Sequence, residues 1–501
     1  MKKNVTKTIF VNTLACPTLG WLMRVMEAKK PEPPTLGKLF RMEQGRDIEM
    51  MARSLFPGGL AIEDANLDLA HEKTLNAIKN RDVSAIFDAT FMVDNFVTKI
   101  DILQRVRGGS SLNEVKSSVV DKPEFIDDMA YTAMVAAKFG LKISDISLIL
   151  ISKDFRLGMG NDRLFVKIDH TDEVQSRADL FEPYWEPVEK ITRAPRKPEP
   201  ELKFVCKECE LFEECLGAGI KNHIFNIPRL SEKKYDDLTK RGIVRIEDIP
   251  DSFALTDRQA RVRDCVKKNQ PFVGAELKGC LEGLSWPVYY LDFETVMTAI
   301  PLYPEIAPYD KVPTQCSVHK CSEPGRDPEH YEFLADQSRD CRKEFAEDLI
   351  GTLGGGGSIV VYGTLEKTIL SGLADMLPNL SDEINSLIGR MINLESIVGA
   401  NFYHPDFHGR TSIKVVLPVL VPGMSYDSLE IKDGDSAAAA FAYLALGKYK
   451  GKKAEEVKKN LKAYCAQDSL ALYEVHQRLT QICSTKFKKH ESPHQASLGE
   501  F

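Results

Sequence analysis

The sequence has no long hydrophobic run. A helix that spans a membrane needs about 20 consecutive, mostly apolar residues, and no stretch of the 501 residues approaches that length. The residues that follow Met1–Lys7 also lack the apolar core of a secretory signal. We therefore expect a cytoplasmic protein with no membrane partner.

The sequence also lacks a disulfide framework and a net positive charge. Its 11 cysteines are an odd number without regular spacing, which argues against a secreted, disulfide-bonded protein. The formal net charge is −7, so nucleic-acid binding would depend on local basic patches. One candidate patch precedes Tyr464, although a solvated helix face is the better explanation of a lysine run taken alone. Its lysines are Lys448, Lys450, Lys452, Lys453, Lys458, Lys459 and Lys462.

The chain is too long for one ordinary hydrophobic core, because single cores stop growing at about 250–300 residues. A proline-rich stretch at 193–200 and a polar, helical stretch further on divide it. We expect an α/β domain at 1–222, a helical linker at 223–285 and a second α/β domain at 286–501.

Four acids stand in three short motifs of the C-terminal half. Asp292 and Glu294 alternate along the apolar run at 287–295, which predicts a buried strand with both carboxylates on one face. Glu366 follows a second apolar run, where a helix begins. Asp468 lies on a predicted helix, with Tyr464 one turn before it.

These acids suit two-metal hydrolysis of a phosphodiester. Two divalent cations about 3.5–4 Å apart hold the attacking and leaving oxygens, and carboxylates are suitable ligands for Mg²⁺ or Mn²⁺. Tyr464 would position the attacking water or help to deprotonate it.

In their order and placement, the three motifs resemble those of the DnaQ-type 3′–5′ exonucleases, in the tyrosine (DEDDy) variant, over about residues 286–485. The resemblance implies an RNase H-like fold. Glu366 stands where the family usually has Asp, and Gly363 stands where Asn is common. Both departures keep open a site that binds without cleaving.

A second constellation lies in the N-terminal half. Residues 97–103 and 112–117 alternate like strands around turn residues 107–111. A hairpin would bring Asp101 beside Glu114 and Lys116, where the acids can hold Mg²⁺ or Mn²⁺ and the ammonium can stabilise developing negative charge. A surface strand with alternating charges is the alternative.

This constellation resembles the core of PD-(D/E)XK nucleases of the RecB type. A helical segment at 125–131 follows the hairpin, and a helical stretch that carries Glu49 precedes it. The resemblance implies a mixed sheet with helices, and it makes Glu49 a further metal ligand in place of the usual His. Thr132 stands where these proteins usually have Gln.

Cys206, Cys209 and Cys215 follow this predicted core, and Cys16 precedes it. In iron–sulfur RecB-type nucleases, cysteines split in this way hold a 4Fe–4S cluster that joins the two ends of the domain. Zn²⁺ or incidental thiols are the alternatives.

The whole order resembles a bacterial family in which a RecB-type nuclease with a cysteine cluster precedes a DnaQ-type exonuclease. It implies a metal-dependent nuclease in DNA repair or anti-phage defence, with DNA as the favoured substrate, RNA as a possible one, and protein partners in such a complex. A nucleic-acid-binding or assembly component is the alternative. The residues expected near the terminal nucleotide are Tyr309, Pro313, Gln315, Ser317, His319, residues 403–406, Ser412 and Lys414. Ordinary loop and strand packing is the alternative for each of them.

Overall fold

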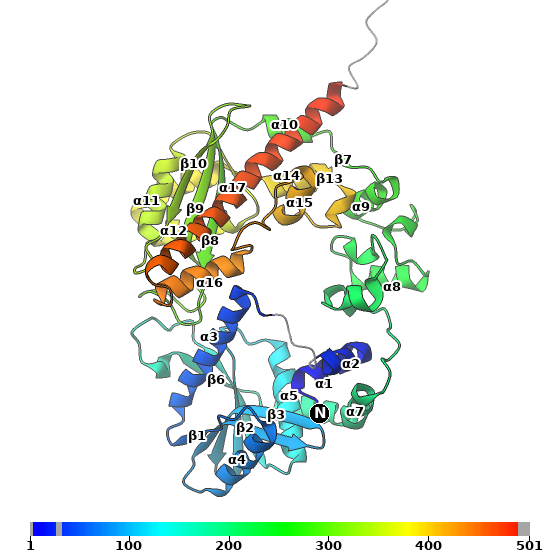
Figure 1. Cartoon of the computed structure of the whole chain (residues 1–501), viewed down its shortest axis with the longest axis vertical. Coiled ribbons are helices and arrows are strands. Elements are labelled where there is room, and N and C mark those ends of the chain that lie inside the picture. Colours follow the sequence, from blue (N-terminus) through cyan, green and yellow to red (C-terminus); the bar gives the residue numbers. More distant parts are fainter. Residues whose placement is uncertain (1–3, 27–32, 489–501) are drawn as a thin grey trace, which may run out of the picture. The chain divides into compact units, whose positions relative to one another are not determined.

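The computed structural model describes residues 4–26 and 33–488 and divides into two compact units (Figure 1). The first unit comprises residues 1–216 and 297–310, and the second comprises residues 217–296 and 311–501. Residues 223–285, the expected linker, belong to the second unit. Each unit has a mixed sheet with helices, so the predicted α/β class is confirmed.

The first unit contains a six-stranded sheet in sequence order. Strands β1 and β2 are parallel, as are β4 and β5, and the other neighbouring pairs are antiparallel. The strands are β1 (Gly59–Ala61), β2 (Ala85–Val93), β3 (Phe96–Val106), β4 (Gly109–Val115), β5 (Ile143–Ile151) and β6 (Phe165–Asp169). The helices are α1 (Lys7–Ala15), α2 (Pro17–Met26), α3 (Leu36–Ala52), α4 (Leu67–Lys79), α5 (Pro123–Lys138), α6 (Thr171–Phe181) and α7 (Trp185–Arg193).

The predicted hairpin is the pair β3 and β4. Val106 pairs with Gly109, and Gly108 in the turn has a φ of 95°, a backbone conformation that glycine adopts without steric cost. The helical segments expected around Glu49 and at 125–131 are α3 and α5. These local predictions are confirmed because turn chemistry and hydrophobic period agree in each of them.

The second unit contains a five-stranded sheet in the order β10-β9-β8-β11-β12, and a two-stranded sheet of β7 and β13. In the larger sheet, β8, β9 and β10 are antiparallel neighbours, whereas β11 and β12 run parallel to β8. The strands are β7 (Phe272–Val273), β8 (Val288–Val296), β9 (Val312–Cys321), β10 (Glu329–Leu334), β11 (Ser358–Val361), β12 (Met391–Asn393) and β13 (Phe402–Tyr403).

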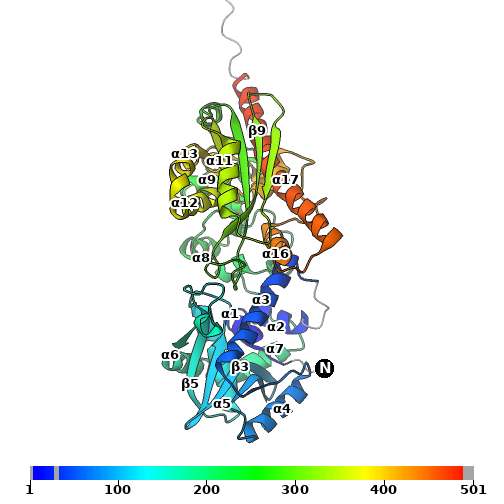
Figure 2. The same cartoon turned by 90° about the vertical axis from the view of Figure 1, so that its left-hand side faces the viewer.

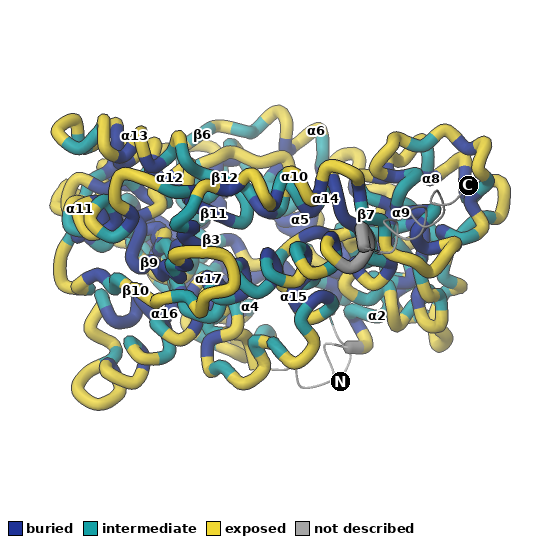
Figure 3. The backbone as a smooth tube through the Cα atoms, turned by 90° about the horizontal axis from the view of Figure 1, so that it is seen from above, coloured by how far each residue is buried: buried dark blue, intermediate teal, exposed yellow. Residues whose placement is uncertain are grey.

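Helices cover both faces of this sheet, with α11 and α17 on opposite sides in Figures 1 and 2. The helices are α8 (Glu232–Lys240), α9 (Asp257–Lys268), α10 (Leu277–Glu282), α11 (Arg342–Leu353), α12 (Leu365–Met376), α13 (Ser381–Gly389), α14 (Leu394–Asn401), α15 (Ile413–Leu420), α16 (Gly434–Ala445) and α17 (Gly451–Lys488). Figure 3 shows the central strands buried and the outer helices with exposed faces.

The alternation of side chains along β8 separates the hydrophobic core from the acids. Tyr289, Leu291 and Phe293 pack into a cluster with α11 and α12. Asp292 and Glu294 point to the other face, where α17 lies against the sheet. This face therefore carries both acids of the first motif.

Helix α17 is 38 residues long, and its sequence is rich in charged residues. Among the described residues, no helix combines the length and the apolar character that a membrane span requires.

Two acid sites and a cysteine cavity

Three of the four predicted C-terminal acids converge. Asp292 and Glu294 on β8 and Asp468 on α17 each offer a carboxylate oxygen, and these oxygens lie within 4.8 Å of one another. Carboxylate oxygens bind Mg²⁺ or Ca²⁺ at about 2.0–2.6 Å. One divalent cation can therefore contact all three residues.

Glu366 lies next to this group, in the first turn of α12. Its side chain is buried, and Oε2 has no hydrogen-bond partner among the described residues. Burial raises the pKa of Glu366 to about 7. Its charge acts on Asp292 and Glu294, so this unpartnered carboxylate oxygen is suited to a second cation.

Burial and mutual repulsion act on the acids together. Burial and the charge of Asp468 raise the pKa of Glu294 to about 8, and the same two causes raise the pKa of Asp292 well above its usual range. Acids packed in this way retain protons. A divalent cation would displace those protons and remove the repulsion, so the residues fit Mg²⁺ or Mn²⁺.

Tyr464 faces the same group from α17. Its hydroxyl accepts a hydrogen bond from Lys414 Nζ at 3.2 Å. The Tyr426 hydroxyl donates to Asp468, and the Lys414 ammonium lies 5.3 Å from the Tyr426 ring and 5.4 Å from the Tyr464 ring. The site therefore contains the predicted Lys414 ammonium and a second phenol, that of Tyr426, which the sequence did not predict.

The chemistry of Tyr464 follows from its surroundings. Burial and the charges of Asp468 and Glu294 raise its pKa, which keeps the phenol neutral. A neutral phenol orients a water molecule by hydrogen bonding and does not take its proton. Of the two roles predicted for Tyr464, positioning of the water is the one that this environment favours.

Substitution of Tyr464 tests this role. We expect Tyr464→Phe to lower the hydrolysis rate by about 10²-fold, and the melting temperature to change little, because one hydrogen bond contributes about 1 kcal/mol. Tyr473→Phe is the matched control, since Tyr473 lies on the same helix and its hydroxyl donates to the Arg326 carbonyl at 3.3 Å. Parental turnover in Tyr464→Phe would leave Tyr464 as a packing residue.

Polar contacts hold α17 in register over the sheet. Gln315 Nε2 donates to the Leu461 carbonyl at 2.9 Å, and the Cys465 thiol donates to Asp292 at 3.5 Å. Further along, the Ser469 hydroxyl bonds Ser317 at 2.6 Å and His319 at 2.8 Å. This ladder fixes the positions of Tyr464 and Asp468.

These hydrogen bonds to α17 show that part of the expected nucleotide-binding patch was wrong. Gln315, Ser317 and His319 are buried and their hydrogen bonds hold α17, so they are not available to a terminal nucleotide. Tyr309 belongs to the first unit, where its hydroxyl bonds Ser117 at 2.6 Å. Lys414 is the member of that set that faces the acids.

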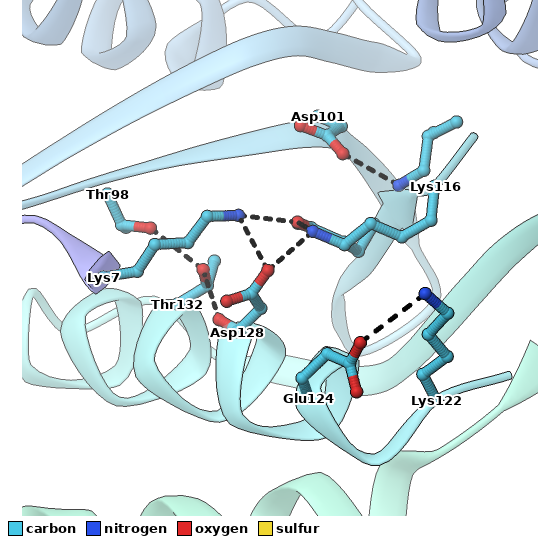
Figure 4. Close-up of polar contacts among 10 residues, drawn as sticks. Lys7, Thr98, Asp101, Lys116, Lys122, Glu124, Asp128 and Thr132 are labelled. Carbon is cyan, nitrogen blue, oxygen red and sulfur yellow. Dashed lines mark hydrogen bonds and ion pairs between the residues drawn. The ribbon is translucent and has the colours of Figure 1, made fainter. Parts of the chain in front are cut away.

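The N-terminal hairpin places its acids as predicted. The pairing of β3 with β4 reaches Ile102 and Asn113, and Asp101 and Glu114 are the residues next to that pair, close enough for the charge of Glu114 to act on Asp101. Asp101 accepts the Val115 backbone N–H at 2.8 Å. Lys116 Nζ lies 2.9 Å from Glu114 and 2.7 Å from Asp128 on α5 (Figure 4).

Glu49 joins these acids from α3. Burial and the charges of Asp88 and Glu114 raise its pKa, and burial and the charge of Glu114 raise the pKa of Asp101 well above its usual range. Glu114 Oε2 is buried without a hydrogen-bond partner among the described residues. These features fit one divalent cation, although no three acids here lie as close together as those of the C-terminal group.

Thr132 faces inward from α5. Its hydroxyl accepts a hydrogen bond from Thr98 at 3.1 Å and donates to the Asp128 carbonyl at 3.0 Å (Figure 4). Both contacts are internal, so Thr132 supports the helix that carries Asp128.

The four predicted cysteines line one cavity of the first unit. Cys16, Cys206, Cys209 and Cys215 surround it with apolar side chains that include Leu19. Backbone N–H groups donate to two of the sulfurs, from Leu19 to Cys16 and from Lys203 to Cys206, both at 3.4 Å. Among the described residues, no three of these sulfurs lie within 4.8 Å of one another.

Contacts near the cavity join the beginning of the first unit to residues 192–198. Trp21 Nε1 donates to the Ala194 carbonyl at 2.8 Å, and Arg24 donates to Thr192 at 2.6 Å. The cysteines therefore lie where these two chain segments meet.

Part of the second unit matches a known sequence family. A sequence family described as a domain of unknown function (DUF2779) matches residues 289–412. This segment contains Asp292, Glu294 and Glu366 and ends before Tyr464 and Asp468. No curated protein and no solved structure matches the chain.

Proposed function

We propose that the protein is a metal-dependent nuclease that hydrolyses DNA phosphodiester bonds, with 3′–5′ exonuclease chemistry at the C-terminal acids. The observation that carries this proposal is the convergence of Asp292, Glu294 and Asp468 within 4.8 Å. Tyr464 and Lys414 beside them add a group that can orient water and a cation that can contact phosphate.

Each residue has a defined task in this proposal. Bound divalent cations would activate the water and stabilise charge on the scissile phosphate. Asp292, Glu294 and Asp468 would hold one cation, and Glu366 would hold the other. Tyr464 orients the attacking water, and Lys414 keeps Tyr464 in place and offers its charge to the phosphate.

The sheets support the two fold assignments that we propose. In the second unit, three antiparallel strands are continued by two strands parallel to β8, and the acids lie on β8 and at the start of the helix after β11. This arrangement supports an RNase H-like domain. In the first unit, an antiparallel hairpin is continued by a parallel strand, which supports a PD-(D/E)XK domain.

We assign a second hydrolytic centre to the first unit. Asp101, Glu114 and Glu49 would hold a divalent cation, and the unpartnered Oε2 of Glu114 supports this assignment. Hydrolysis there would give products distinct from those of the C-terminal centre.

A 4Fe–4S cluster is the group that we propose for the cysteine cavity. Four cysteines around one apolar cavity and the N–H···S contacts to Cys16 and Cys206 support this proposal. Zn²⁺ is the alternative. The role of the cluster in the proposal is to hold Cys16 to the segment at 206–215.

The biological setting, DNA repair or anti-phage defence with partner proteins, follows from family analogy alone. The sequence motifs of the C-terminal acids do not by themselves discriminate deoxyribose from ribose. RNA is therefore the alternative substrate, and a binding or assembly component is the alternative function.

An assay on end-labelled single-stranded and double-stranded DNA and RNA tests the proposal. With Mg²⁺ or Mn²⁺, we expect DNA to be shortened from its 3′ end and EDTA to stop the reaction. Faster hydrolysis of RNA than of DNA would make RNA the substrate in this proposal. Binding of nucleic acid without hydrolysis under every metal condition would establish the binding component instead.

A further inference from the structure

The first unit holds a second lysine beside the lysine of its motif. Lys7, the first residue of α1, places Nζ 2.9 Å from Glu114 and 3.4 Å from Asp128. Lys116 contacts the same two carboxylates at 2.9 and 2.7 Å. The four side chains form a closed ring of ion pairs, and Figure 4 shows Lys7 and Lys116 on either side of Asp128.

The backbone fixes the position of Lys7. Val5 is fully buried and is hydrogen bonded on both sides: its N–H donates to the Asn95 carbonyl at 2.6 Å, and its carbonyl accepts from Val97 at 3.0 Å. The Tyr131 hydroxyl also donates to that carbonyl at 2.6 Å. Thr6 then caps α1. The ammonium of Lys7 is therefore placed by the sheet and by α5.

A second lysine balances the charges of the four acids and one divalent cation. Asp101, Glu114, Asp128 and Glu49 carry four negative charges when all are ionised, and Lys7 and Lys116 carry two positive charges. The sum of −2 is balanced by one divalent cation. Without Lys7, the same site with its cation would keep one negative charge, and that charge would repel a phosphodiester.

The two lysines differ in their access to solvent. The Lys116 side chain is 19% exposed and its ammonium lies 5.4 Å from the Phe125 ring. The Lys7 side chain is 36% exposed. An ammonium has three N–H donors, so Lys7 can keep both carboxylate contacts and still donate to a phosphate oxygen.

We propose that Lys7 is the residue that contacts the substrate phosphate in the N-terminal site, and that Lys116 chiefly holds Glu114 and Asp128 in place. This inference rests on the proposed nuclease function of the first unit.

Binding and cleavage measurements test Lys7 in full-length protein that carries Asp292→Asn, which silences the C-terminal acids. Binding of a fluorescent DNA duplex is measured in Ca²⁺ over a range of salt concentrations. The salt slope is the fall of the logarithm of the binding constant with the logarithm of the salt concentration, and each phosphate contact adds about 0.9 to it. We expect Lys7→Met to lower the slope by about one and the Mg²⁺-dependent cleavage rate by about 10–100-fold. Lys7→Arg should keep most of the slope.

Lys122→Met is the matched control, because Lys122 precedes α5 and its ammonium pairs with Glu124 at 3.7 Å (Figure 4). It should bind and cleave like its parent. A parental slope and rate in Lys7→Met would overturn the role of Lys7 alone. A parent that neither binds nor cleaves DNA would overturn the N-terminal part of the proposed function as well.

Folding is monitored in the same variants by thermal unfolding. If Lys7→Met does not fold, Lys7→Gln replaces it, and the same fall in slope is expected. Equal losses in Lys7→Arg and Lys7→Gln, together with lower melting temperatures in both, would show that Lys7 acts only in packing and would overturn the proposal.

Discussion

Asp292→Asn will lower 3′–5′ hydrolysis on the order of 10³-fold, because it removes a ligand from the centre of the C-terminal acids without changing the shape of the side chain. The measurement is single-turnover release of the terminal nucleotide in Mg²⁺. Products of the N-terminal site should remain, and Glu114→Gln should remove only those.

Asp292→Asn should lower the hydrolysis rate without lowering the stability of the fold. Burial and Asp468 raise the pKa of Asp292, so the ionised carboxylate is unfavourable in the folded protein at neutral and alkaline pH. We expect the variant in EDTA to melt at the parental temperature or above it.

Asp348→Asn serves as the control, because Asp348 is exposed on α11, on the other side of the sheet. It should keep parental activity. If Asp292→Asn and Asp348→Asn hydrolyse DNA equally well, the C-terminal acids are not the reaction centre.

Cys206→Ser will remove iron and acid-labile sulfide from anaerobically purified protein, because Cys206 lines the cavity with the other three cysteines. The parent should be brown and contain both. We expect the first unit of the variant to melt about 5–10 °C lower, since a tightly bound group stabilises only the folded state.

Cys206→Ser should also disturb the N-terminal acids. Helix α1 begins at Lys7 and ends at its C-cap, Cys16, so release of Cys16 loosens the lysine that contacts Glu114. Cys280→Ser is the control, since its sulfur lies in the second unit, 3.9 Å from Asn401. Stoichiometric zinc without iron in the parent would establish the zinc alternative.

Local sequence patterns predicted the parts of both sites that lie on single elements. Alternation along β8 predicted that Asp292 and Glu294 share a face, and the Gly108 turn predicted the hairpin that brings Asp101 beside Glu114. The four-residue spacing of Tyr464 and Asp468 likewise predicted that both lie on one side of a helix. In each case the interacting residues are neighbours on one strand, one hairpin or one helix.

Contacts between distant segments could not be predicted in this way. Lys7 reaches Glu114 across 107 positions of sequence, and Tyr426 reaches Asp468 across 42. A single lysine or tyrosine in a polar context is usually a surface residue, and only the folded chain brings these side chains to the acids. The polar ladder under α17 was missed for the same reason.

The central claim is that Asp292, Glu294 and Asp468 bind a divalent cation for hydrolysis. Anomalous diffraction from crystals soaked in Mn²⁺ tests it most directly, since it locates the ion without depending on any substrate. We predict a manganese peak at about 2.0–2.6 Å from carboxylate oxygens of all three residues. A saturated crystal whose manganese peaks lie elsewhere, with these carboxylates unliganded, would contradict the account.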